Sequence, residues 1–231
     1  MYITVLGTFG TGKSAIASSL AINLGIDLVS SGMIGKNKNI DVDNSGMFVI
    51  IGKYRKRFDG SYTGGLDTTK SQEDRFRLLK NEWLNKKRKI IIGESHMTFY
   101  WSSFWKRIKE ELLPKVSRKI LIIHLSSSKS ILKARWSYRS GNTKAFTKTQ
   151  NESMSSKIKN AQSIANKINS KKSLKKKVIY KEFRSNKPKD LKKVLFYVAK
   201  KIKKIENVTL GNNLIVSDLH KTKKSGLKKL F

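Results

Sequence analysis

The feature that most constrains the fold is a glycine-rich turn near the start of the chain. An apolar, β-branched run at residues 2–6 predicts a strand, and apolar residues at helical spacing over residues 14–24 predict a helix. Between them, Gly7-Thr-Phe-Gly-Thr-Gly-Lys-Ser14 matches the pattern G-x-x-x-x-G-K-[ST]. A chance match in a glycine-bearing turn is the alternative, but the flanking strand and helix argue against it.

Each position of this pattern has a physical role in holding a phosphate chain. The glycines let successive backbone N–H groups point inward, and the helix N-terminus adds the positive end of its dipole. We expect Lys13 to bridge the β- and γ-phosphates of ATP and the Ser14 hydroxyl to hold Mg²⁺. The predicted nucleotide-binding residues are therefore Gly7, Thr8, Gly10, Thr11, Gly12, Lys13 and Ser14.

Strand-like and helix-like segments alternate along the remainder of the chain. Such alternation predicts an α/β fold, a three-layer sandwich with a mostly parallel five-stranded sheet. Leu28 and Val29 suggest a short strand, residues 32–46 suggest a loop, and residues 55–67 suggest a mobile loop. Further helices are expected at residues 71–84, 99–113 and 188–204. We place the main domain at residues 1–204 and a basic, partly ordered C-terminal tail at residues 205–231.

The charge balance indicates a polyanionic partner. Fifty Lys and Arg residues face 16 Asp and Glu residues, which leaves a net charge of +34. Such a surplus attracts nucleic acid, most simply DNA, in a salt-dependent manner. The alternative is an AT-rich genome, which raises Lys, Asn and Ile. This account is incomplete, because glutamate codons tolerate AT as well as lysine codons do and acidic residues stay at 16. An anionic membrane surface is the weaker option, because no basic amphipathic helix with a clean apolar face stands out.

Composition also bounds the compartment and the chemistry. The absence of cysteine excludes disulfides and thiolate metal sites, and three histidines make a His-rich metal centre improbable. No apolar run approaches the roughly 20 residues of a transmembrane helix. We therefore expect a soluble protein of the cytoplasm (the host cytoplasm if it is viral), with no membrane association and no evident protein partner.

An acidic residue follows the apolar run at residues 90–92. Glu94 stands at the end of this predicted strand, where a carboxylate could reach a metal or an acceptor. We expect Ser14 and Glu94 to form the metal site, with Glu94 ordering metal-bound water or acting as a base. The alternative is a carboxylate on a surface turn. Ser95 and His96 flank it, and we expect His96 to serve packing or capping.

Two arginines follow the strand predicted at residues 119–125. Arg135 and Arg139 are four residues apart and so share one helical face, just before a Gly141-Asn142 break. Planar, permanently charged guanidinium groups suit the stabilisation of a transferring phosphoryl group. We therefore expect both to be catalytic, although spaced arginines in so basic a chain prove little alone.

A third group of candidates lies between these motifs and points to the acceptor site. Asp67 could accept the proton of an attacking hydroxyl, and Tyr54 could stack on a base. A glycine-rich hairpin with a capping Asp is the alternative. The predicted acceptor-binding residues are Lys53, Tyr54, Gly64, Gly65 and Asp67.

Taken together, these motifs resemble the nucleoside and nucleotide kinase group of P-loop proteins over roughly residues 1–200. The segments Gly52-Lys53-Tyr54, Gly64-Gly65-Leu66-Asp67 and Gly93-Glu94-Ser95 look like those of a phage-type kinase that phosphorylates 5-hydroxymethyl pyrimidines, such as 5-hydroxymethyluracil, in DNA. The resemblance implies ATP, Mg²⁺ and a hydroxymethyl oxygen as attacking group. The chain departs from deoxynucleoside kinases in lacking an Asp-Arg or Glu-Arg pair after residues 89–92.

Three functions follow as hypotheses. The first is a kinase acting on a base held in a polynucleotide, with Tyr54, Phe99, Tyr100 or Trp101 stacking on a flipped base. The second is a kinase of free nucleosides or nucleoside monophosphates, and the third is a nucleic-acid-binding NTPase. In the third case Glu94 would activate water, and arginines on the chain's own lid argue instead for transfer.

Overall fold

A six-stranded sheet forms the centre of the molecule. The computed structural model describes residues 1–8, 10–28, 40–56, 62–65, 71–96, 103–140, 155–156, 159, 163, 166, 176–211 and 214–215. The strand order is β2-β3-β6-β1-β7-β8, and every pairing is parallel except the antiparallel β2–β3 pair at one edge. The strands are β1 (Tyr2–Gly7), β2 (Ile40–Val42), β3 (Phe48–Ile51), β6 (Ile90–His96), β7 (Ile120–Ser126) and β8 (Val178–Arg184).

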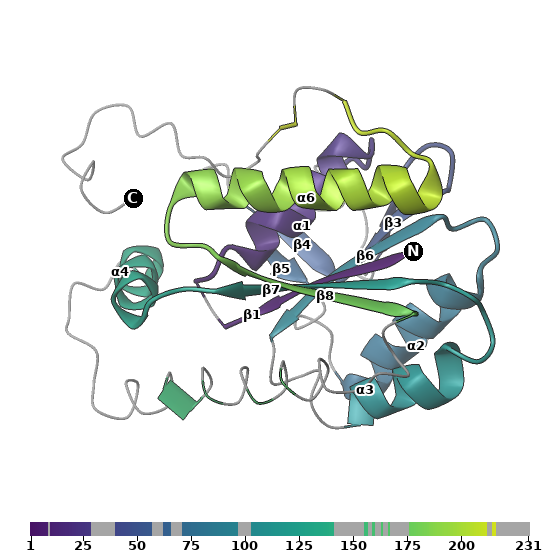
Figure 1. Ribbon diagram of the computed structural model, residues 1–231, viewed down its shortest axis with the longest axis horizontal. Helices are drawn as coiled ribbons and strands as arrows, with labels where there is room; N and C mark the ends of the chain where they lie inside the picture. The colour runs from purple at the N-terminus through teal and green to yellow at the C-terminus, as the bar shows by residue number, and fades with distance from the viewer. Residues whose placement is uncertain are drawn as a thin grey trace.

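Helices cover both faces of this sheet (Figure 1). On one face α1 (Lys13–Asn23) and α6 (Pro188–Glu206) bury a core with alternate residues of the strands, such as Ile3 and Ile123. On the other face α2 (Gln72–Leu84), α3 (Ser103–Arg107) and the π-helical turn η4 (Ile108–Leu112) bury a second core around Trp83. The molecule is therefore the three-layer α/β sandwich that the alternating pattern predicted.

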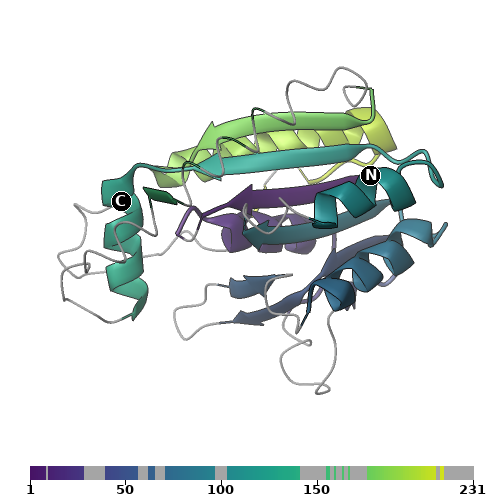
Figure 2. The ribbon, with the colours of Figure 1, turned by 90° about the horizontal axis from the view of Figure 1, so that it is seen from below.

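The carboxyl ends of the central strands meet at one edge of the sheet. In register, Gly7 of β1 lies beside His96 of β6 and Leu125 of β7. Helix α4 (Lys129–Ser140) lies beyond this edge, as Figure 2 shows from below. Ligands of open parallel sheets bind at this edge, so the fold itself indicates where the site lies.

The sheet has one strand more than predicted. β2 lies within residues 32–46, which the sequence suggested were a loop, and Leu28 is not in a strand, while Val29 lies outside the described residues. With only three residues, β2 is too short to show the alternation of apolar and polar residues that predicts a strand. The strand depends on a turn in which an Asp43 carboxylate oxygen accepts from the Phe48 N–H at 2.7 Å, returning the chain antiparallel to β3.

Two other segments also differ from the prediction. The stretch predicted as a mobile loop, residues 55–67, includes the end of β4 (Lys53–Lys56) and all of β5 (Tyr62–Gly65). The two strands pair as a two-stranded antiparallel sheet, which agrees with the hairpin of the alternative interpretation. The helix predicted at residues 99–113 is, in its described part, the short α3 followed by the η4 turn. Hairpin pairing and an i→i+5 turn both depend on tertiary packing, which periodicity does not report.

The start of the predicted C-terminal tail packs on the main body. Helix α6 runs to Glu206, and Asn207 ends it in a left-handed conformation with φ 53°. Leu210 is buried in the α1–α6 core. The Asn23 side chain then holds the Ile215 backbone through hydrogen bonds of 2.8 and 3.0 Å. No helix in the described part of the chain is long and apolar enough to span a membrane.

Candidate active site

The predicted phosphate loop connects β1 to α1 at the carboxyl edge of the sheet. Gly12, the residue before α1, has φ 87°, a left-handed conformation that strains any residue with a β-carbon. The Thr11 hydroxyl donates to the Thr8 carbonyl at 2.8 Å, and the Lys13 ammonium donates to the same carbonyl at 2.9 Å. Lys13 therefore lies across the loop, at the place where a bound phosphate chain would meet its charge.

The predicted metal-binding pair comes together in the structure. The Ser14 hydroxyl, in the first turn of α1, donates to the Glu94 carboxylate at 2.8 Å. Glu94 is carried by β6, where it lies in register with Val5 of β1, and it is only 2% exposed. Strand pairing thus brings together two residues 80 positions apart in the sequence.

This pair of oxygens fits Mg²⁺. Magnesium prefers oxygen ligands and is commonly held by one or two protein groups together with phosphate oxygens and water. No group of three or more His, Asp or Glu residues suited to a metal occurs among the residues that the structure describes. A magnesium ion at Ser14 and Glu94 would therefore complete its shell from the nucleotide and from water.

Gly65, from the predicted acceptor motif, lies against the carboxylate of Glu94. A β-carbon built on Gly65, at the end of β5, would lie 2.3 Å from Cγ of Glu94 and 2.6 Å from its Oε1. Only a residue without a side chain allows this approach, and Gly65 also has φ 106°. The structure therefore joins two motifs that the sequence presented separately.

Replacing Gly65 by alanine is expected to weaken binding of MgATP about ten-fold or more, because the new methyl group must displace the Glu94 carboxylate. Titration calorimetry measures the affinity. Gly25→Ala is the matched control, since Gly25 also has a positive φ, of 78°, but a β-carbon added there would meet nothing within 4 Å. Equal affinities in the two variants would contradict the proposed contact with Glu94.

Other predicted acceptor residues occupy the same hairpin. Lys53 pairs with Gly65 and Tyr54 with Gly64 in the β4–β5 ladder. Tyr54 is 2% exposed and belongs to the α1–α6 core. Its ring is covered in this structure, so stacking on a base would require the hairpin to move.

Several predicted site residues cannot be placed. Asp67 and the proposed stacking residues Phe99, Tyr100 and Trp101 lie outside the described residues, as do the side chains of Arg139 and His96.

Arg135 forms hydrogen bonds with the backbone of the phosphate loop and of the β8–α6 connection. Its guanidinium donates to the Gly10 carbonyl at 2.9 Å and to the Asn186 carbonyl at 3.3 Å. The Asn186 side chain in turn accepts from the Ser127 hydroxyl at 2.8 Å and the Ser128 N–H at 3.1 Å. Arg135 thereby links α4, the phosphate loop and the β8–α6 connection. Asn186 carried no sequence signal, because its partners come from distant parts of the chain.

Another polar contact lies on the face of the sheet that α2 and α3 cover. His124 of β7 shares a hydrogen bond of 2.7 Å with the Tyr180 hydroxyl of β8. Burial lowers the pKa of His124 and raises the pKa of Tyr180, so both are neutral near pH 7. The hydrogen bond between these two neutral groups explains why an apolar strand can contain a buried histidine.

A glycine loop between a buried strand and a helix, with a carboxylate from the adjacent strand on the first serine of that helix, is the arrangement of P-loop nucleotide-binding proteins. No protein-family model matches the chain, and no curated protein matches it.

Among solved structures, the chain is similar to several kinases. A gluconokinase from Sinorhizobium meliloti is 12% identical with a TM-score of 0.46, and the match covers 89% of this chain and 93% of that one. A Janibacter sugar kinase is 13% identical with a TM-score of 0.42, covering 91% and 98%. Deoxyadenosine kinase from M. mycoides is 15% identical with a TM-score of 0.42, covering 89% and 100%.

Proposed function

We propose that the protein is a kinase that transfers the γ-phosphoryl group of ATP to a hydroxyl group in the presence of Mg²⁺. The observation that carries this proposal is the contact between Ser14 and Glu94, 2.8 Å apart at the base of the phosphate loop. A loop that only bound an anion would not need a buried carboxylate beside it, because the carboxylate repels phosphate unless a cation lies between them. Mg²⁺, when bound, neutralises phosphate charge and orients the reacting group.

The residues of the site divide the work of the transfer. Gly10, Thr11 and Gly12 hold the phosphate chain through their backbone, and Lys13 neutralises the β- and γ-phosphates. The acceptor hydroxyl oxygen forms a bond to the γ-phosphorus while the bond from that phosphorus to the β–γ bridging oxygen breaks, and ADP leaves. The hydroxyl proton passes to a carboxylate, either Asp67 or Glu94.

The arginines of α4 have a part in the same proposal. Arg135 already contacts the carbonyl of Gly10 at 2.9 Å, so its positive charge lies beside the loop that holds the phosphates. Arg139 lies one helical turn further along the same helix. Together they would stabilise the charge on the phosphoryl group during transfer.

We further propose that the acceptor is the hydroxymethyl group of a modified pyrimidine in DNA. Two observations support this choice over a free nucleoside or nucleoside monophosphate. Gly65 of the resembling acceptor motif packs against Glu94, and this contact supports an acceptor site beside the expected metal-binding residues. The net charge of +34 also suits a polymeric anion better than a small metabolite.

The test is incubation of the protein with γ-labelled ATP, Mg²⁺ and DNA containing 5-hydroxymethyluracil or 5-hydroxymethylcytosine, followed by mass analysis of the released nucleosides. We expect label in the polymer as a phosphorylated hydroxymethyl base, and none with unmodified DNA. Label on free nucleosides alone would overturn the DNA acceptor but keep the kinase. ATP hydrolysis stimulated by unmodified DNA, without a phosphorylated product, would overturn the kinase in favour of an NTPase.

A further inference from the structure

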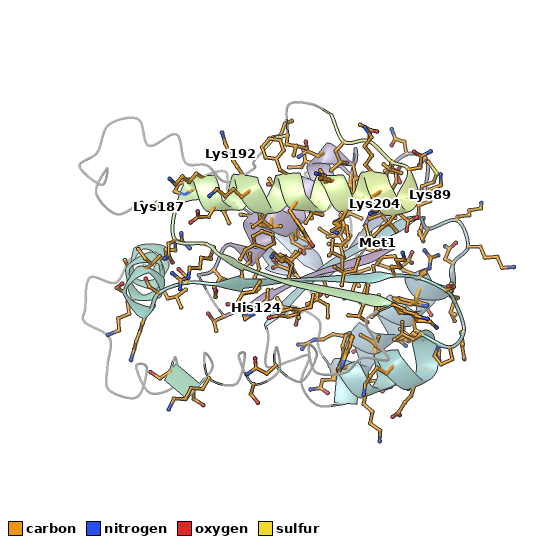
Figure 3. The ribbon with its side chains drawn as sticks, viewed as in Figure 1. Met1, Lys89, His124, Lys187, Lys192 and Lys204 are labelled. Carbon is orange, nitrogen blue, oxygen red and sulfur yellow. The ribbon has the colours of Figure 1, made fainter. Side chains whose placement is uncertain are left out.

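The outer face of α6 carries an unusual concentration of positive charge. Six lysines and one phenylalanine recur there at helical spacing, and all seven are exposed: Lys189, Lys192, Lys193, Phe196, Lys200, Lys203 and Lys204. We call this set the lysine face. It extends ~22 Å along the helix, at 1.5 Å per residue. In Figure 3, Lys187, Lys192 and Lys204 mark the helix from its start to its last turn, with Lys192 directed away from the sheet.

No carboxylate of α6 balances this charge. Asp190 accepts the Lys187 backbone N–H at 2.8 Å and so caps the start of the helix. Glu206, at the other end, contacts the Met1 ammonium at 2.8 Å. Within the described residues, no ion pair involves any lysine of the lysine face. Six like charges on one helical face repel one another, which disfavours such a surface unless it meets an anion.

Phe196 lies near the middle of the lysine face and is 59% exposed, the largest exposure among the large apolar residues of the described chain. An exposed aromatic ring between cations is the combination with which proteins hold single-stranded nucleic acid, because lysines follow the phosphates and the ring stacks on an unpaired base.

Contrary to the expectation from the sequence, α6 is a basic amphipathic helix, but a membrane surface fits it poorly. An amphipathic helix binds lipid by inserting its apolar face, and the apolar residues of α6 already pack in the protein core: Leu191, Val194, Leu195, Val198 and Ile202. What remains for a partner is charge and one aromatic ring.

The lysine face begins beside the phosphate loop. A β-carbon built on Gly12 would lie 3.1 Å from Cδ2 of Leu191, so the first turn of α6 contacts the loop directly. From there the helix runs back along the sheet toward the amino ends of its strands (Figure 1). A strand bound along the lysine face would thus have one end at the rim of the candidate active site.

We propose that the lysine face of α6 is a binding surface for single-stranded DNA, on which Phe196 stacks on a base and the lysines contact phosphates. The choice of DNA as the polymer rests on the proposed function, whereas the surface itself rests on the exposed lysines and Phe196 of α6. The bound strand runs away from the phosphate loop, so that a nucleotide beyond the Lys189 end of the helix reaches the active site.

The test measures binding of a fluorescent oligodeoxythymidylate of roughly 20 nucleotides, a length that exceeds the site size of common single-strand-binding domains. Fluorescence anisotropy over a series of salt concentrations gives the affinity and the salt slope. This oligonucleotide carries no hydroxymethyl group, so binding does not depend on phosphoryl transfer. Binding at the lysine face without any transfer to hydroxymethylated DNA would retain this inference while the proposed acceptor failed.

Two variants with matched controls test the surface. Lys192→Gln/Lys193→Gln/Lys200→Gln should lower the salt slope by about 2, because each phosphate contact on a single strand contributes about 0.7. The control Lys86→Gln/Lys87→Gln/Lys119→Gln removes the same charge from exposed positions at the amino ends of β6 and β7. Phe196→Ala should weaken binding about five-fold or more, the effect of losing one stacked base. Leu84→Ala, at a residue 39% exposed, is its control.

Each remaining outcome would overturn the inference. An equal loss in the two lysine variants would show that binding follows overall charge, and an unchanged affinity in Phe196→Ala would remove the stacked base. Tighter binding of the matching duplex or of an oligouridylate would assign the surface to another nucleic acid. Displacement of the oligonucleotide by phosphatidylserine vesicles or polyglutamate at equal charge would assign it to a membrane or an acidic protein.

Discussion

Replacing Lys13 by alanine is expected to lower phosphoryl transfer about 10²–10³-fold or more, the usual effect of removing one preorganised donor from the developing charge of a transition state. Lys13 is the first residue of α1, and its ammonium lies across the phosphate loop at 2.9 Å from the Thr8 carbonyl. No other residue of the loop can supply this charge, since its other members act through backbone groups or hydroxyls. Steady-state turnover with saturating MgATP measures the loss.

The Lys13→Ala protein should remain folded. The substitution removes the partly buried hydrogen bond to the Thr8 carbonyl, and a bond of this kind contributes about 1 kcal/mol to the free energy of unfolding. A melting temperature within a few degrees of the wild type, measured by circular dichroism, would confirm this. Lys86→Ala, at an exposed position far from the loop, is the control and should leave turnover unchanged. Full activity in Lys13→Ala would rule out the phosphate loop as the site of the reaction.

The second large effect is expected from Glu94→Gln. The amide keeps the size of the side chain but loses its negative charge, so the Ser14–Glu94 pair can no longer attract a divalent cation. We expect turnover to fall about 10²-fold or more together with a higher Mg²⁺ concentration for half-maximal activity. Titration of Mg²⁺ at fixed ATP measures both. Glu110→Gln, at an exposed residue of η4, is the isosteric control.

The same variant separates the two roles left open for Glu94. If the carboxylate serves the metal, the Mg²⁺ requirement changes and the acidic limb of the pH–rate profile stays. If it is the proton acceptor, the acidic limb disappears while the Mg²⁺ requirement stays, and Asp67→Asn should then retain most of its activity. Wild-type values of turnover and Mg²⁺ requirement in Glu94→Gln would contradict both roles.

The phosphate loop, the β4–β5 hairpin and the DNA-binding surface proposed for α6 are connected by direct contacts. Gly65 contacts Glu94, Glu94 contacts Ser14, and Gly12 contacts Leu191 of α6. A ligand that fixes the conformation of one of these parts therefore affects the conformation of the others through direct packing. If α6 binds DNA as proposed, these contacts would link the bound polymer to the candidate site at the sheet edge.

The phosphate loop and the class of fold could be predicted from the sequence because both are local. The G-x-x-x-x-G-K-S pattern is contiguous, and the strands of a parallel sheet buried on both faces are continuous apolar runs, as at residues 120–123. Helix α6 was likewise visible, from a proline at its first turn and a regular apolar spacing. The charge surplus could be counted from the sequence, but its arrangement as a lysine face became visible only on the folded helix.

The pairing of Ser14 with Glu94 was expected from the sequence, but the other contacts of the site became visible only in the tertiary structure. Strand order places Glu94 beside β1 and on Ser14, and hairpin pairing brings Gly65 within van der Waals distance of that carboxylate. The fold also buries Tyr54, which the sequence suggested was accessible to a base. It brings Asn186, which carried no signal in the sequence, into the hydrogen bonds beside the phosphate loop. The physical reason is that sequence periodicity reports how a segment folds along its own axis, whereas contacts between segments arise from the packing of the whole chain.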